Sequence, residues 1–205
     1  MRPKLPNLVK TKAIQKFRAN RGFTLIELLV VITIIAILAG VAFPVVNGVM
    51  ARARKVRILA VAKDLQVAIK SYQTEYNRYP SETTGSDSEE KTDTSDLISL
   101  LTGENSSDLN PREIKFIDLP MAKNGSGGLV GSGSGGFSLL DDWTQPYVVI
   151  MDTDYDNRIE NPDSSNSDPK VSSGAPSQLP LGVAVYSTGP DKDASTKDDI
   201  TTWRG

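Results

Sequence analysis

An uninterrupted apolar run is the feature that most constrains how this chain can fold. The run covers Leu28–Val46, which are 19 residues with Thr33 as the one clearly polar side chain. A helix of this length, rising about 1.5 Å per residue, is roughly 28 Å long and matches the hydrocarbon core of a bilayer. Gly40 and Pro44 interrupt the run near its far end, and Pro44 is expected to loosen the helix there. We therefore predict a transmembrane helix.

A single carboxylate, Glu27, stands at the start of this run. An ionised carboxylate within hydrocarbon costs on the order of 3 kcal/mol or more, so such a residue usually has a cationic partner. No Lys, Arg or His lies between residues 22 and 51, so the helix itself cannot supply one. Two interpretations follow: Glu27 lies at the level of the lipid headgroups, or a positive charge comes from another copy of the chain.

The segment before the helix is strongly basic. Residues 1–22 hold seven Lys and Arg residues and no acid. The positive-inside rule places this end in the cytoplasm and the rest of the chain outside. A secretory signal peptide is the alternative, because it also has a basic region followed by an apolar core. That alternative does not account for Glu27, and the apolar run is longer than an ordinary signal-peptide core.

These residues resemble a known family. Gly22 followed by FTLIELLVVITIIAILA is similar to the prepilin signature of type IV pilins and type II secretion pseudopilins. In that family a membrane-embedded prepilin peptidase cuts after the glycine and N-methylates the new first residue, which is Phe23 here. The resemblance implies that Glu27, the fifth mature residue, pairs with the N-terminal ammonium of a neighbouring subunit during assembly.

The resemblance also implies a fold and a set of partners. The expected fold is α+β and pilin-like, with a long N-terminal helix packed on a small antiparallel sheet with irregular loops. The expected partners are further copies of the chain in a filament, the prepilin peptidase, the inner-membrane platform of the secretion system, the minor pseudopilins and the membrane.

The hydrophobic pattern divides the chain into successive parts. From Val56 to Tyr76, apolar residues recur at spacings of three and four between charged residues, which predicts an amphipathic helix. We expect one helix from about Thr24 to Tyr76, ended by Pro80. The predicted parts are a cleaved basic leader at 1–22, a transmembrane and assembly helix at 23–46, its amphipathic continuation at 47–80 and a periplasmic head with strands and acidic loops at 81–205.

The head is predicted from short apolar runs between polar stretches. Val148–Met151 is typical of a buried strand, Leu181–Ser187 of the last strand, and Asp96–Leu101 of a short capped helix. The polar or glycine-rich stretches 81–96, 124–136 and 161–180 are expected to be loops, the first two of them mobile.

Composition excludes several classes of function. Without the leader, 23 − 7 = 16 basic residues face 25 acidic ones, a net charge of −9, which gives no basic face for nucleic acid. The chain has no Cys and no His, so the usual nucleophile–base pairs and most transition-metal sites are absent and we predict no enzyme activity. Many type IV pilins close a C-terminal loop with a disulfide. This chain has none, which favours a pseudopilin.

Two further segments resemble the major pseudopilin. Asp142–Tyr147 is similar to its Asp-Pro-Trp-Gly-x-Pro-Tyr turn, although Trp143 follows Asp142 directly. Ser187–Asp191 and Asp198–Trp203 are similar to its closing segment, whose loop binds calcium in that family. This resemblance implies calcium ligands at Ser187, Asp191, Asp199 and, as a further candidate, Asp198. Calcium takes about six or more oxygens, so carbonyls or water would complete the shell. The alternative is a solvated acidic turn.

A second acidic cluster follows the predicted Val148–Met151 strand. Asp152, Asp154 and Asp156 occupy positions 1, 3 and 5 of an EF-hand-type loop, and Asp163 occupies position 12. This pattern predicts a weaker calcium site, and the alternative is an acidic β-turn.

The leading hypothesis is a structural subunit of a type II secretion pseudopilus that assembles into a helical filament after cleavage and N-methylation. It would be a single-pass protein of the bacterial inner membrane with a cytoplasmic N-terminus and a periplasmic C-terminal domain. The alternatives are a type IV pilin that forms surface fibres, and a membrane-anchored periplasmic calcium-binding protein that never polymerises.

Overall fold

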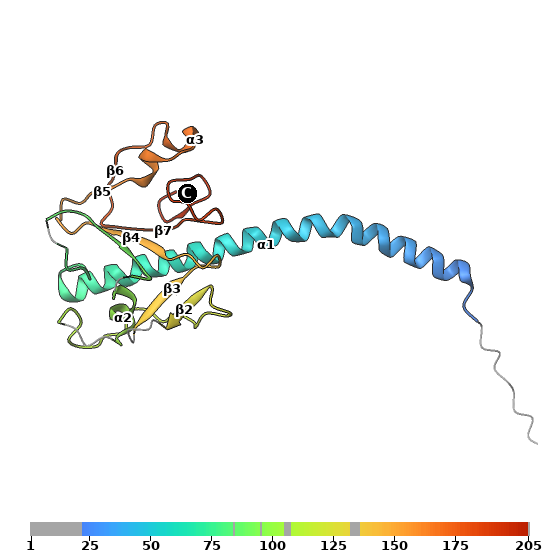
Figure 1. Ribbon diagram of the computed structural model, residues 1–205, viewed down its shortest axis with the longest axis horizontal. Helices are drawn as coiled ribbons and strands as arrows, with labels where there is room; N and C mark the ends of the chain where they lie inside the picture. Colours follow the sequence, from blue (N-terminus) through green and yellow to red (C-terminus); the bar gives the residue numbers. More distant parts are fainter. Residues whose placement is uncertain (1–21, 84, 95, 105–107, 132–135, 205) are drawn as a thin grey trace, which may run out of the picture. The chain divides into compact units, whose positions relative to one another are not determined.

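The computed structural model describes residues 22–83, 85–94, 96–104, 108–131 and 136–204, without the side chains of residues 41–47 (Figure 1). The predicted leader, residues 1–21, lies outside the described part of the chain. The chain divides into two compact units, Met1–Asn47 and Gly48–Gly205, and each is described by itself.

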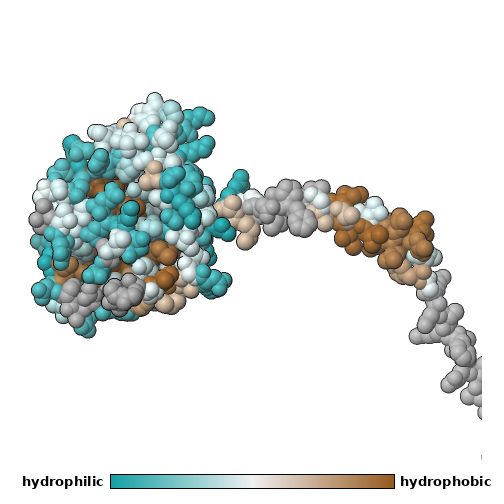
Figure 2. Space-filling view, viewed as in Figure 1, coloured by the Kyte–Doolittle hydropathy of each residue, from teal (hydrophilic) through white to brown (hydrophobic). Residues whose placement is uncertain are grey.

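The first unit contains the beginning of helix α1 (Leu25–Tyr76). A capping box starts the helix: Glu27 Oε2 accepts hydrogen bonds from the amide and hydroxyl of Thr24 at 2.8 and 2.7 Å, and the Glu27 amide donates to Thr24 Oγ1 at 3.3 Å. Apolar side chains are exposed along this part of α1, where Figure 2 shows a brown surface. The predicted helix, Thr24 to Tyr76, is confirmed to within one residue at its start.

The predicted transmembrane run lies in this unit. Thr33, its one polar side chain, donates to the Leu29 carbonyl at 2.8 Å and so satisfies its hydroxyl within the helix. The far end of the run, residues 41–47 with Pro44, lies outside the residues whose side chains are described. Among the described residues, no helix has the length and apolarity needed to cross a membrane.

The second unit is an α+β head, as predicted, in which the C-terminal part of α1 packs on an antiparallel sheet. The helix buries side chains at spacings of three and four, namely Ile58, Ala62, Leu65, Ile69 and Tyr72. The sheet has the order β1-β4-β7-β8. Its strands are β1 (Ser88–Lys91), β4 (Tyr147–Met151), β7 (Val183–Ser187) and β8 (Ile200–Thr201). Val149, Met151, Val183 and Val185 face the helix in one core cluster.

The opposite face of the sheet carries a second core cluster. Val148, Ile150, Ala184 and Tyr186 pack there with Ile159, and with Leu179, Leu181 and Trp203 at the margin. This layer includes β5 (Ile159–Glu160), the 3-10 helix η1 (Pro162–Ser165), α3 (Pro169–Ser172) and β6 (Gln178–Leu179). Because both faces are covered, β4 and β7 are buried at every position, and their sequences are apolar apart from Ser187 at the end of β7.

A helix and a hairpin complete the head: α2 (Leu97–Thr102), β2 (Gly128–Gly131) and β3 (Phe137–Leu140). The structure corrects the loop predictions here. The expected mobile loop 81–96 contains β1, and the expected flexible loop 124–136 contains β2. Both are short strands held by backbone pairing with a partner, so their polar or glycine-rich sequences did not reveal them. Residues 132–135 of the second loop lie outside the described part.

The C-terminal predictions are corrected in the same way. The strand predicted at Leu181–Ser187 begins at Val183, and it is not the last strand, because β8 pairs with it at Tyr186 and Ser187. The predicted loop 161–180 contains η1, α3 and β6. The short helix α2 is confirmed, but Asp96 at its N-cap position makes no capping hydrogen bond with its side chain.

Candidate functional site

The predicted cleavage bond lies just before α1. Gly22, Phe23 and Thr24 have no regular secondary structure, and the Phe23 side chain is 76% exposed. An exposed, irregular segment is the kind of backbone that a peptidase can take into an extended conformation. The site therefore has the accessibility that the predicted cut between Gly22 and Phe23 requires.

Glu27 lies in the first turn of α1. In the uncut chain its carboxylate accepts hydrogen bonds from Thr24, which are neutral donors. Within the described residues no ion pair involves Glu27. The helix start therefore orients this carboxylate without neutralising its charge.

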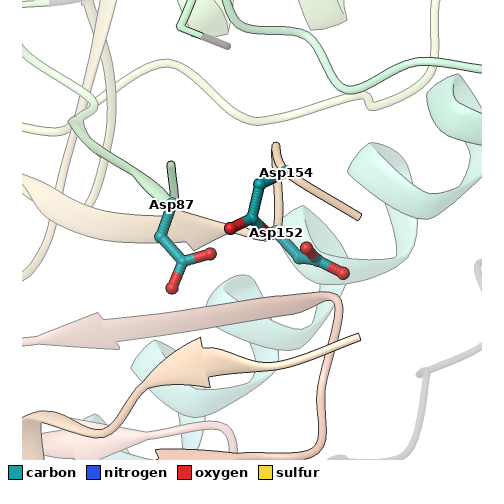
Figure 3. Close-up of side chains that lie close together, drawn as sticks. All are labelled: Asp87, Asp152 and Asp154. Atoms are coloured by element: carbon teal, nitrogen blue, oxygen red, sulfur yellow. The ribbon is translucent and has the colours of Figure 1, made fainter. Parts of the chain in front are cut away.

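Three carboxylates meet at one end of the head (Figure 3). Asp87 precedes β1, Asp152 and Asp154 follow β4, and one carboxylate oxygen of each lies within 4.8 Å of the others. Asp152 accepts hydrogen bonds from the amides of Asp156 at 3.0 Å and Asn157 at 2.9 Å. Asp87 Oδ2 accepts one from the Glu160 amide at 3.1 Å, whereas its buried Oδ1 has no hydrogen-bond partner among the described residues.

Burial and mutual repulsion shape the electrostatics of this cluster. Burial raises the pKa of Asp87, and the neighbouring charges of Asp154, Asp152 and Asp156 raise it further. Burial likewise raises the pKa of Asp152, with a contribution from its hydrogen bond with Asp154. Oxygen ligands of this kind suit a hard divalent cation, which would relieve the repulsion.

This cluster differs from the predicted EF-hand-type set. Asp152 and Asp154 are brought together as expected, but Asp156 and Asp163 lie outside the group. Asp156 Oδ1 accepts from the Arg158 amide at 2.7 Å. Asp163 lies in η1 and forms an ion pair with Arg204. Its place at position 12 of the pattern is therefore corrected, because the chain turns into η1 instead of closing the loop.

Sequence reasoning missed Asp87. This residue lies far earlier in the chain, and antiparallel pairing of Ser88 with Met151 brings it beside the loop after β4. The signal that could have found it was the pairing of a polar edge strand, which hydrophobic periodicity does not detect.

The closing segment divides the predicted calcium ligands into two groups. Ser187 is fully buried, and its hydroxyl donates to Asp141 Oδ2 at 2.6 Å, so it is not directed at the other predicted ligands. Thr196 links two of the acids, since its hydroxyl lies 3.1 Å from Asp198 Oδ1 and 3.3 Å from Asp199 Oδ1. The amide of Asp191 donates to Asp198 Oδ2 at 3.4 Å.

The acids of this loop have opposite pKa shifts. Burial raises the pKa of Asp199 to about 6, although hydrogen bonds from Thr196 and the charge of Arg204 oppose it. Burial acts in the same sense on Asp191, but hydrogen bonds, first from the Asp193 amide, outweigh it and lower the pKa of Asp191. Asp198 and Asp199 thus offer oxygens around the Thr196 hydroxyl. Among the described residues the carboxylates of Asp191, Asp198 and Asp199 do not converge as those of Asp87, Asp152 and Asp154 do, and Ser187 does not join them.

The turn that resembles the major pseudopilin connects α1 with the sheet. Asp141 is fully buried, and its Oδ1 accepts from the amides of Trp143 at 2.8 Å and Gln145 at 2.9 Å. The Asp142 side chain, only 6% exposed, forms an ion pair with Arg57 and has Arg54 Nε at 3.8 Å. These contacts are structural and fix the turn against the helix.

Comparison with known proteins finds a family model and several relatives that each match part of the chain. Residues 17–43 match the family model described as the prokaryotic N-terminal methylation motif. The chain is 37% identical to a fimbrial protein of Neisseria meningitidis serogroup A over 74 residues, which are 36% of this chain and 44% of that protein. It is 45% identical to the type IV major pilin protein PilA of Myxococcus xanthus over 60 residues, 29% of this chain and 27% of that one.

A secretion-system protein is similar to the same degree. Type II secretion system core protein G of Pectobacterium carotovorum subsp. carotovorum is 37% identical over 62 residues, 30% of this chain and 40% of that protein. The chain therefore spans less than half the length of these curated relatives. No solved structure matches it. Pilins and a secretion protein are both among the relatives, and all of these matches are partial.

Proposed function

We propose that this prepilin-type, pilin-like protein is, in its mature form, a structural subunit of a type II secretion pseudopilus. Cleavage between Gly22 and Phe23 and N-methylation of Phe23 would release it for assembly into a helical filament. Before assembly it would be anchored in the bacterial inner membrane by a single pass, with its N-terminus in the cytoplasm and its head in the periplasm.

The observation that carries this proposal is the isolated carboxylate of Glu27 in the first turn of an apolar helix. Cleavage at Gly22 creates an ammonium group at Phe23, four residues and about one helical turn, roughly 6 Å, before Glu27. An ammonium from a second copy supplies the cation that the described residues do not. In a medium of low dielectric constant such a pair is strong enough to drive association and to set its register.

The choice of a pseudopilin rests on three supports. The chain has no Cys for the C-terminal disulfide loop of many pilins. The Asp142–Tyr147 turn and the segment ending in Trp203 resemble the major pseudopilin. One relative carries the name of a type II secretion core protein. The second candidate is a type IV pilin of surface fibres, which the fimbrial and PilA relatives favour.

The partners follow from this role. We propose the prepilin peptidase, further copies of the chain, the inner-membrane platform and the minor pseudopilins, with no nucleic acid and no enzyme activity. Loss of exoprotein secretion in a deletion strain would support the pseudopilin, and loss of surface fibres would support the pilin.

We also propose that the head binds calcium. Asp87, Asp152 and Asp154 fit a hard cation beyond β4, where their carboxylate oxygens lie within 4.8 Å of one another. Asp191, Asp198 and Asp199 are the further candidates that the resemblance implies in the closing loop. Calcium titration with a thermal melt tests both, using Asp199→Asn and Asp87→Asn to separate them. A melting temperature that does not move at millimolar calcium would remove both sites from the proposal.

The N-terminus of the mature protein is the decisive measurement. Mass spectrometry of protein from the native membrane should show a chain that begins at Phe23 and carries one added methyl group. Glu27→Ala should keep membrane insertion and abolish filaments, whereas Glu75→Ala, on the same helix, should keep both. A mature start elsewhere, or filaments that form equally well with Glu27→Ala, would contradict the proposal and favour an anchored protein that does not polymerise.

A further inference from the structure

A groove lies beside α1 at the end of the head where Ile58 is buried. Its volume is about 390 Å³, and its apolar lining includes Ile58, Val61, Leu119, Met121 and Leu139. Arg57 and Lys123 are also among its lining residues. Lys123 is exposed and forms no ion pair within the described part of the chain.

Further positive charge lies on α1 just before the residues that line this groove. Arg52 and Lys55 are exposed on α1 within two turns of Ile58, and the described residues give them no ion-pair partner. The acid in the lining, Asp142, is already paired with Arg57 and lies near Arg54. This end of the head is therefore apolar with a basic border, and we call it the basic groove.

The loop after β4 has the opposite character. Asp154, Tyr155 and Asp156 form an acidic tip, beside which Asp87 and Asp152 add further negative charge. The basic residue of this loop, Arg158, donates a hydrogen bond to Gln178 Oε1 at 3.4 Å. Tyr155 is 51% exposed and has a positive φ of 63°, a conformation that bulky residues rarely adopt without a reason.

The acidic tip and the basic groove lie at opposite ends of the same head. The Tyr155 ring is 5.6 Å from that of Tyr79, beyond the C-terminal end of α1. Ile58 and Tyr76 are separated along α1 by about 27 Å at 1.5 Å per residue. Strand β4 also runs from the groove towards the tip, because Tyr147 at its start lines the groove and Met151 at its end precedes the tip.

The exposed apolar side chains support a contact between these two ends. Outside α1, the large hydrophobic residues that remain exposed in the described head are Met121 and Tyr155. Met121 lines the groove and Tyr155 forms the tip. An exposed aromatic residue between two carboxylates complements an apolar groove with a basic border.

We propose that the acidic tip of one copy docks into the basic groove of the next copy in the filament. The Tyr155 ring fills the apolar lining, and Asp156 faces Lys123. Such a contact joins two different patches of the same chain, so it is heterologous and repeats without closing, as an open helical filament requires. The inference rests on the proposed filament and names a surface outside the apolar helix by which its heads recognise each other.

Disulfide crosslinking tests the contact on the full chain, which has no cysteine of its own. Met121→Cys and Asp156→Cys variants, co-expressed as separate chains, should give a mixed dimer on mild oxidation of assembled filaments. Lys170→Cys, on the exposed surface of α3, replaces Asp156→Cys as the matched control and should give none. Adding Glu27→Ala to both chains should abolish the mixed dimer, since the contact forms only on assembly.

Charge reversal provides an independent measurement. Lys123→Glu and Asp156→Lys should each lower filament yield about tenfold or more, and the two together in one chain should restore most of it. Tyr155→Ala should also lower the yield, while Tyr155→Phe and Lys170→Glu should not. Thermal melts check that each variant folds as the wild type does.

The outcomes separate this inference from the proposed function. Normal filaments from both single reversals, with no mixed dimer, would overturn the docking and leave the filament role intact. A mature, N-methylated wild-type chain that never assembles would overturn both. A yield that depends on calcium but not on Lys123→Glu would mean that a divalent cation, not a second head, is the partner of the acidic tip, and would also overturn the docking.

Discussion

The hydroxyl of Ser187 donates a hydrogen bond to Asp141 across 2.6 Å, and both residues are fully buried. Asp141 belongs to the turn before β4, and Ser187 ends β7, so the bond ties the turn to the sheet. Ser187 was a predicted calcium ligand by resemblance. Its hydroxyl is instead occupied by a structural partner.

Ser187→Ala is expected to reduce the free energy of unfolding by about 1–3 kcal/mol. The reason is that a buried carboxylate loses a donor and keeps its desolvation cost. Urea denaturation measures the change, and calorimetric titration should show calcium affinity unchanged. A variant with wild-type stability and weakened calcium binding would instead make Ser187 a ligand.

Arg57→Ala is expected to destabilise the head by about 1–2 kcal/mol, measured by urea denaturation. Its ion-pair partner Asp142 is 6% exposed, so removing Arg57 leaves a nearly buried charge with Arg54 Nε, at 3.8 Å, as its remaining cation. That second cation and the 64% exposure of the Arg57 side chain limit the effect. Lys55→Ala, two residues away on α1 and exposed, should change stability by less than about 0.5 kcal/mol. If Arg57→Ala costs no more in the Asp142 background than in an Asp142→Asn background, the ion pair is not the cause.

Arg204→Ala is expected to cost about 2–3 kcal/mol by the same measurement. Asp163 is 9% exposed in its side chain, forms an ion pair with Arg204 and accepts a hydrogen bond from Trp203 Nε1 at 2.8 Å. Loss of the guanidinium therefore leaves a buried carboxylate with one neutral donor. Asp163→Asn added to Arg204→Ala should recover part of the loss. If Asp163→Asn recovers none of the lost stability, the effect of Arg204→Ala comes from the contacts of Arg204 with backbone carbonyls instead.

The sequence predicted the parts of this protein whose side chains carry the information. The apolar and amphipathic periodicity gave α1 almost to the residue, and continuous apolar runs gave β4 and β7. Strand β1 was missed because its sequence, Ser-Glu-Glu-Lys, is polar and its place is set by backbone bonds to β4.

The cluster of Asp87, Asp152 and Asp154 was predicted only in part, because local sequence patterns do not detect strand pairing. Asp152 and Asp154 are close in sequence and could be grouped by a spacing rule. Asp87 joins them only through strand pairing, and Asp163 leaves the group because Arg204, near the C-terminus, binds it. Local patterns therefore found the local half of the cluster, and long-range pairing decided the remainder.

The stability of the calcium-free head is expected to fall as pH rises from about 4 to about 6. Burial raises the pKa of Asp199 from 3.8 to about 6, so the folded head binds a proton there that the unfolded chain has already released. The stabilisation is complete below the unfolded pKa and is lost as pH rises through the folded one. Asp87 and Asp152, whose pKa values burial also raises, act in the same direction.

Thermal melts between pH 4 and pH 7 in the presence of a chelator measure this dependence. Asp199→Asn removes the titrating group and should flatten the curve in this window, whereas Asp118→Asn, at an exposed position, should leave the slope unchanged. Calcium in the closing loop would favour the ionised carboxylate, so its addition should lower the pKa of Asp199 and reduce or reverse the loss of stability as pH rises. A slope that Asp199→Asn does not alter would assign the titration to other carboxylates, of which Asp87 and Asp152 are the first to test.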